Sequence, residues 1–108
     1  MRDDVNETDW QLFKERIGQW QESFMERLNS EYARILADER RTASEKFWKI
    51  EQRINADKSK YGVICRRSRS TLLGNMIRLY GEGAITDDDL DGFSEELVKS
   101  VKAMNKPL

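Results

Sequence analysis

The feature that most constrains this chain is a long stretch that lacks helix breakers and carries apolar residues at helical spacing. There is no glycine between Gly18 and Gly62, and Pro107 is the only proline of the 108 residues. Several short strands joined by tight turns would need such residues, so the sequence predicts an all-α fold. A chain of this length is expected to form a single helical domain, 1–108.

A stripe of large apolar side chains marks the first predicted helix. Their spacings of three and four residues are those of a heptad seam, the pattern by which helices pack in coiled coils. The stripe consists of Trp10, Phe13, Ile17, Trp20 and Phe24. Thr8 is the predicted helix cap, because Gln11 stands three residues later, as in a capping box.

The apolar pattern continues to about residue 58, and two structures fit the segment 8–58. One unbroken, coiled-coil-like helix would keep the later apolar residues on the same half of its surface and would be about 75 Å long. A helical hairpin would break within 38–41, just before a second potential capping box at Thr42 and Glu45. We favour the unbroken helix, because a turn between helices usually contains Gly, Asn or Pro.

Two shorter helices that pack as a pair are predicted within 63–104. The first ends at Gly81 and Gly83, which supply backbone conformations that terminate helices. Its inner face is expected to carry Leu72, Leu73, Met76, Ile77 and Tyr80.

The second of these helices is predicted to start at the cap Thr86. Ile85 and Leu90 flank that cap at the spacing of a hydrophobic staple, around a first turn rich in aspartate. Its buried face is expected to consist of Leu90, Phe93, Leu97, Val101 and Met104.

The composition excludes most catalytic chemistry. The chain has no histidine, which removes histidine general bases, Ser-His-Asp triads and histidine-ligated zinc. Cys65 is the only cysteine and can form neither an intramolecular disulfide nor a four-cysteine zinc site. Residues 87–92 match the opening of a calcium loop, but its twelfth position is Val98 instead of a carboxylate. We therefore expect no catalytic residues, no metal and no cofactor.

Charge is strongly segregated along the chain, although the formal net charge is only −1. The segment 58–81 holds six basic side chains and no acidic one: Lys58, Lys60, Arg66, Arg67, Arg69 and Arg78. The carboxylates of the acidic last segment, 82–108, or the acidic face of a partner could neutralise them, or they could bind the phosphates of a nucleic acid. We favour neutralisation, because the pI near 5.6 is far below that of dedicated DNA-binding domains.

These features together favour a small non-catalytic interaction or adaptor protein. Aromatic residues are enriched in protein interfaces, and the chain has little other mass with which to cover so long a helix. We expect a homodimer formed along the aromatic stripe, or binding of another protein, and keep nucleic-acid or phosphate binding by 58–78 as the alternative. No targeting signal and no apolar run of about 20 residues is present, so we expect a cytoplasmic protein that does not enter membranes.

Overall fold

A computed structural model of the chain describes residues 5 to 105 and confirms the all-α prediction. The four α-helices are α1 (Glu7–Leu36), α2 (Ala43–Asp57), α3 (Leu72–Gly81) and α4 (Glu95–Met104), and two single 3₁₀ turns are η1 (Arg69–Thr71) and η2 (Asp88–Leu90). No strand occurs among the described residues.

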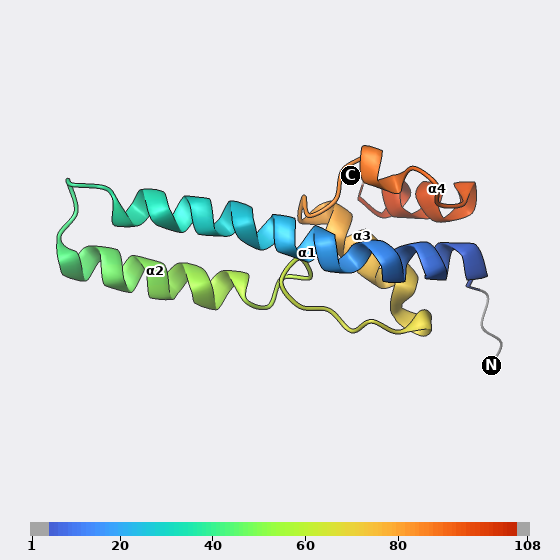
Figure 1. Cartoon of the computed structure of the whole chain (residues 1–108), viewed down its shortest axis with the longest axis horizontal. Coiled ribbons are helices and arrows are strands. Elements are labelled where there is room, and N and C mark those ends of the chain that lie inside the picture. Colours follow the sequence, from blue (N-terminus) through green and yellow to red (C-terminus); the bar gives the residue numbers. More distant parts are fainter. Residues whose placement is uncertain (1–4, 106–108) are drawn as a thin grey trace.

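The helices form an elongated molecule of 55 × 28 × 24 Å (Figure 1). Helix α1 runs along most of its length, and α3 and α4 pack with each other around the N-terminal half of α1. Helix α2 returns alongside the C-terminal half of α1. We call residues 29–57, which comprise the last two turns of α1, the turn that follows them and α2, the arm, and we call the remainder the globular end.

Helix α1 begins at Glu7, and its cap lies two residues before the predicted cap Thr8. The side chain of Asn6 accepts hydrogen bonds from the backbone N–H groups of Thr8 and Asp9, at 2.8 and 3.2 Å. Asn6 is therefore the cap, because asparagine satisfies the free amides of a first helical turn as well as threonine does. Thr8 lies inside the helix, and the predicted cap at this position is wrong.

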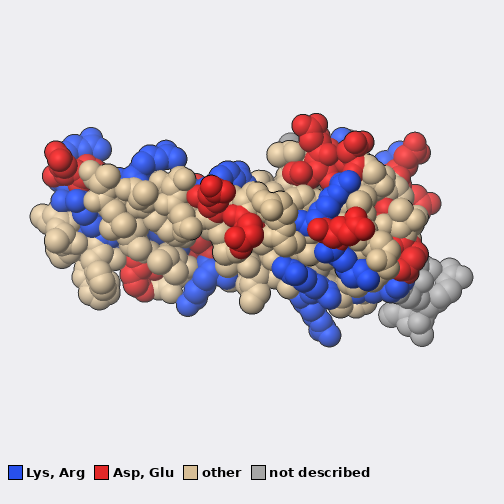
Figure 2. Space-filling model, in the orientation of Figure 1, with Lys and Arg blue, Asp and Glu red and all other residues tan. Residues whose placement is uncertain are grey.

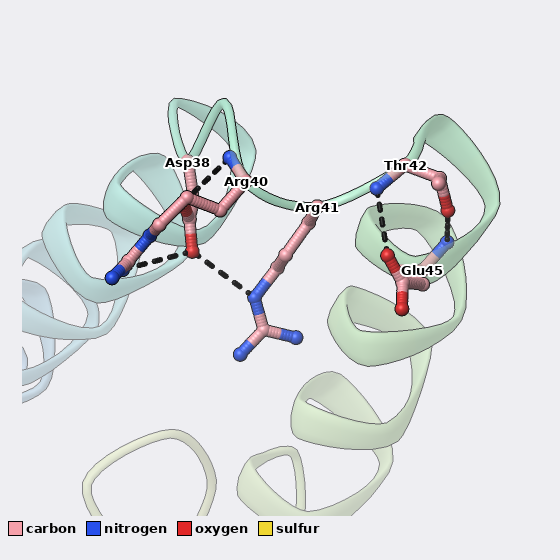
Figure 3. A network of polar contacts seen from close by, with 5 residues as sticks. All are labelled: Asp38, Arg40, Arg41, Thr42 and Glu45. Atoms are coloured by element: carbon pink, nitrogen blue, oxygen red, sulfur yellow. Dashed lines mark hydrogen bonds and ion pairs between the residues drawn. The ribbon is translucent and has the colours of Figure 1, made fainter.

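The preferred prediction of one unbroken helix over 8–58 is also wrong, because the chain turns between α1 and α2. The Asp38 carboxylate accepts hydrogen bonds from the backbone N–H and Nε of Arg40, at 3.0 and 2.9 Å, and from Nε of Arg41 at 3.3 Å (Figure 3). The hydrogen bonds from Arg40 lower the pKa of Asp38 to about 2. An aspartate that folds back on its own backbone forms this turn without glycine or proline.

The alternative prediction of a capping box after this turn is confirmed. Thr42 Oγ1 accepts the N–H of Glu45 at 3.2 Å, and Glu45 Oε1 accepts the N–H of Thr42 at 2.7 Å (Figure 3). These hydrogen bonds also lower the pKa of Glu45. Helix α2 therefore starts at a fixed residue, which sets its register against α1.

One apolar core lies in the globular end and extends to Leu28 on α1. It combines one face of α1 with α3, α4 and the segment that joins them. Its buried members are Phe13, Ile17, Trp20, Phe24, Leu28, Leu72, Met76, Leu79, Ala84, Ile85, Leu90, Phe93, Leu97 and Val101. The predicted helix pair 63–104 is thus built, but Leu73 and Met104, both predicted to face inward, are 42% and 67% exposed.

Helix α4 begins nine residues after the predicted cap Thr86. Ile85 and Leu90 are buried as the predicted staple requires, but they enclose only the 3₁₀ turn η2. Gly92 then adopts a positive φ of 93°, which ends the turn, and Ser94 caps α4. The residues around Thr86 thus form a single 3₁₀ turn, and the prediction that a helix starts there is wrong.

A buried carboxylate ties the start of α4 to the start of α1. Asp9 is 3% exposed, and its two oxygens accept the backbone N–H and the hydroxyl of Ser94 at 2.8 and 2.6 Å. Ser94 Oγ in turn accepts the N–H of Leu97 as the α4 cap. This contact joins residues 85 positions apart, so no local sequence pattern indicates it.

Candidate interaction surfaces

The predicted aromatic stripe lies in the core instead of on the surface. Phe13 and Ile17 are at most 1% exposed, and Trp20 and Phe24 are 7% and 5% exposed. Trp10 is half-buried, between the cations of Lys14 and Arg69. The premise that the chain is too small to cover this stripe is wrong, because α3, α4 and the segment that joins them enclose it.

The exposed aromatic side chains are on the arm. Phe47 and Trp48 of α2 are 63% and 62% exposed, and their rings contact each other edge to face with centroids 5.0 Å apart. Ile54, one of the few other large apolar residues of α2, is 44% exposed. Asp57 is the only buried residue of α2, so residues 5–105 do not completely cover the apolar face of this helix.

The base of the arm is held by a polar cluster centred on Asp57. Tyr32 donates its hydroxyl to Asp57 at 2.6 Å, Lys60 lies 3.0 Å from the same carboxylate, and Arg53 bridges it to Glu31. Burial and the bond to Asp57 raise the pKa of Tyr32 to about 12. Burial alone would raise the pKa of Asp57, but the hydrogen bonds from Tyr32 and Lys60 outweigh it and lower that pKa.

The structure divides the six cations of segment 58–81 into two groups. Lys60 pairs with Asp57, and Arg69 pairs with Glu7 on α1. The other four, Lys58, Arg66, Arg67 and Arg78, have no carboxylate within ion-pair distance among residues 5–105. The expected neutralisation thus accounts for two cations, and it comes from α1 and α2 instead of from the acidic last segment.

The loop that carries these cations is anchored by three polar side chains that the sequence analysis did not single out. Gln21 is 6% exposed and donates to the carbonyl of Tyr61 at 3.0 Å, while Asn75 is 3% exposed and donates to the carbonyl of Arg66 at 2.6 Å. Glu82 accepts the backbone N–H groups of Tyr61 and Gly62, both at 3.1 Å. The one sequence signal that could have indicated such an anchor is a glutamine at position 21, which helical spacing places among the apolar residues of α1. A polar side chain that is buried in this way usually has a hydrogen-bond partner.

Cys65 lies in the same loop and is half-buried. Gln21 Nε2 lies 3.7 Å from its sulfur, and burial raises the pKa of the thiol. Burial thus outweighs the Arg67 guanidinium, which acts on the pKa of this thiol in the opposite direction. No group of three or more His, Cys, Asp or Glu residues within 5–105 is arranged to hold a metal ion.

The chain has no match among family models, curated proteins or solved structures. Within the part of the chain that the structure describes, no helix is both long enough and apolar enough to cross a bilayer.

Proposed function

We propose that the protein is a non-catalytic interaction module that pairs with a second copy of itself through the apolar face of its arm. The observation that carries this proposal is that α2 has 15 residues, presents Phe47, Trp48 and Ile54, and buries none of them. A helix of this length is marginal by itself in water, and most helices in proteins are stabilised by packing an apolar face. The arm supplies only one neighbouring helix for that purpose.

The spacing of the apolar residues on α2 supports a helical partner. Ala43, Phe47, Ile50 and Ile54 follow steps of four, three and four residues, which is a heptad seam. Within one arm, α1 packs against only one side of this seam. The hairpin of a second arm would cover the other side, and the two hairpins together would form a four-helix bundle.

The charge of the arm supports a second copy as this partner. Residues 29–57 contain six acidic and six basic side chains, so two arms carry no net charge and do not repel each other. Covering the exposed part of one aromatic ring, such as that of Phe47 or Trp48, contributes about 3 kcal/mol to the free energy of association at roughly 25 cal/mol per Å². Four rings in a symmetric pair contribute about 12 kcal/mol, comparable with the roughly 4–15 kcal/mol cost of association.

Sedimentation across a concentration series tests the proposal. We expect the wild type to shift from monomer to dimer as its concentration rises, and Trp48→Glu to remain monomeric. Leu73→Ser is the matched control, because Leu73 is 42% exposed but lies on α3 in the globular end, and it should dimerise as the wild type does. A wild type that is monomeric at every concentration would contradict the proposal, as would a Trp48→Glu protein that still dimerises.

A further inference from the structure

We infer that the loop between α2 and α3, together with the adjoining face of α3, binds the phosphate backbone of single-stranded nucleic acid through Arg66, Arg67 and Arg78. This site lies outside the arm face that carries the proposed self-association, and it does not depend on that proposal. The inference rests on how the loop is held, which charges are left unpaired, and what kind of side chain carries them.

The loop runs back along α3, which brings cations from separate parts of the chain together. Asn75 of α3 binds the carbonyl of Arg66, and Arg78, one turn further along α3, lies over the ring of Tyr61 at 4.9 Å. Gln21 of α1 links the two ends of the loop, because it binds the carbonyl of Tyr61 and accepts a bond from Arg67 at 2.6 Å. Arg66, Arg67 and Arg78 therefore belong to one surface.

This surface keeps a positive charge after its internal contacts are counted. Asp57 and Glu7 pair with Lys60 and Arg69, and the Glu82 carboxylate is held by two backbone amides of the loop. These three carboxylates offset half of the six positive charges. Figure 2 shows Lys and Arg along the lower edge of the globular end, where Figure 1 draws this loop, and Asp and Glu gathered over η2 and α4.

The anchors fix the backbone of the loop without using its free cations. Gln21 and Asn75 are neutral, and the bond from Arg67 to Gln21 occupies one of the five N–H donors of its guanidinium. Arg66 and Arg78 are exposed and donate to no described residue. A loop whose backbone is already fixed loses less conformational entropy when it binds an anion.

The kind of side chain favours nucleic acid over other anions. Guanidinium groups bind phosphate oxygens through two parallel N–H donors and also stack on bases, whereas lysine acts only as a point charge. Arg78 already stacks on Tyr61, and its exposed side is open to a base. Ile64 is the only large apolar residue of segment 58–71 that is more than 40% exposed, at 63%, and one such residue gives too little area to insert into a lipid surface.

Single strands fit this surface better than duplexes do. Reading a duplex requires a helix or a two-stranded ribbon that enters a groove, and the loop instead lies flat along α3. If α4 entered a groove, the acidic residues 87–91 just before it would meet the phosphates and be repelled.

The test is fluorescence anisotropy of a labelled single-stranded oligonucleotide titrated with the full chain at several salt concentrations. Three phosphate contacts predict a slope of log affinity against log salt of about −2, so that raising salt from 50 to 200 mM weakens binding about fifteenfold. We expect Arg66→Glu combined with Arg67→Glu to weaken binding by more than about tenfold.

The chain offers a matched control for this double variant. Lys46→Glu combined with Lys49→Glu changes the net charge equally at two cations of α2, which lie on the arm and make no ion pair with a described residue, and should bind as the wild type does. Arg66→Gln alone alters a side chain with no described partner, so it should keep the thermal stability of the wild type while binding several-fold more weakly and with a shallower salt slope.

Three results would overturn the inference. They are the absence of oligonucleotide binding at low salt, equal weakening by both double variants, and binding of polyglutamate or of phosphatidylserine vesicles as tight as binding of the oligonucleotide. An equally tight complex with the same sequence as a duplex would overturn the preference for single strands. None of these outcomes bears on dimerisation, which sedimentation measures separately.

Discussion

The part of α1 in the globular end and the part in the arm both carry apolar residues at steps of three or four, but different elements pack against them. In the globular end, Phe13, Ile17 and Trp20 are enclosed by α3, α4 and the segment between them. In the arm, α1 packs against α2, and Tyr32 and Ile35, which continue the apolar pattern, are only half-buried. A heptad repeat therefore predicts that a helix packs, but the number of neighbouring elements decides whether its apolar face becomes core or stays exposed.

The same substitution in the globular end and in the arm should give the largest difference between the two regions. Phe13 is 0% exposed and Phe47 is 63% exposed. We expect Phe13→Ala to lower the free energy of unfolding by about 3–5 kcal/mol, because it leaves a cavity in a packed core. Phe47→Ala should lower that of the monomer by less than about 1 kcal/mol.

Chemical denaturation at a low protein concentration measures both values. Equal losses for the two variants would show that the arm has a closed core of its own, and would contradict the division into two regions.

A second pair of variants compares crowding at two glycines. A Cβ at Gly62 would lie 2.4 Å from the ring of Phe24, whereas nothing lies within 4 Å of a Cβ at Gly18 on α1. Gly62→Ala should destabilise the protein by about 1–3 kcal/mol through overpacking. Gly18→Ala should stabilise it by roughly 0.5–1 kcal/mol, because alanine favours the helix.

Thermal unfolding of both alanine variants provides this measurement. If Gly62→Ala left the melting temperature unchanged, the Phe24 ring would have room to move. That result would contradict close packing between the loop and the core.

A third comparison concerns the start of α2. Thr42→Ala removes the acceptor of the capping box and should cost about 1 kcal/mol. Because α2 buries so little, we expect this loss to appear as faster amide hydrogen exchange in α2, with exchange in α3 and α4 unchanged. Gln52→Ala, an exposed position of α2 away from the cap, is the control. Faster exchange throughout the chain would show that arm and globular end unfold as one unit.

The smallest expected difference between the regions depends on pH. The pKa of Asp38 is lowered from 3.8 to about 2 by Arg40, so its turn contributes stability that is present above pH 3.8 and lost as the pH falls towards 2. The pKa of Tyr32 is raised from 10.0 to about 12, so its contribution is lost as the pH rises through this range. Asp38→Asn should therefore make the amide hydrogen exchange of the arm less dependent on pH between about 4 and 2. Acid exchange in the arm that is unchanged by Asp38→Asn would argue against this role of the turn.

Local patterns predicted the elements of the fold better than their ends. Helix periodicity, the capping box at Thr42 and the glycine stop after α3 were readable, because each involves residues within one or two turns. The break at Asp38 was not favoured, because an aspartate turn has no distinctive composition. The start of α4 was missed because Gly92 and the contact between Asp9 and Ser94 decide it, and that contact spans the chain.

The candidate surfaces were predictable only in part. The basic segment is visible as a run of charge, but its pairing with Asp57 and Glu7 depends on tertiary structure. The aromatic stripe was correctly located on one face of a helix, but the sequence could not show which chain covers that face. The exposed pair Phe47 and Trp48 was not among the predicted site residues, because their exposure depends on which elements pack against α2.

The central claim is that self-association covers the arm and leaves the core unchanged. The most direct test is fluorine NMR of the protein labelled with fluorotryptophan across a dilution series. Trp48 is exposed on the arm, Trp10 is half-buried and Trp20 is enclosed, so the three indoles report on separate regions. We expect the Trp48 resonance to shift with concentration while the other two stay constant. Shifts of Trp10 or Trp20 with a constant Trp48 would contradict it.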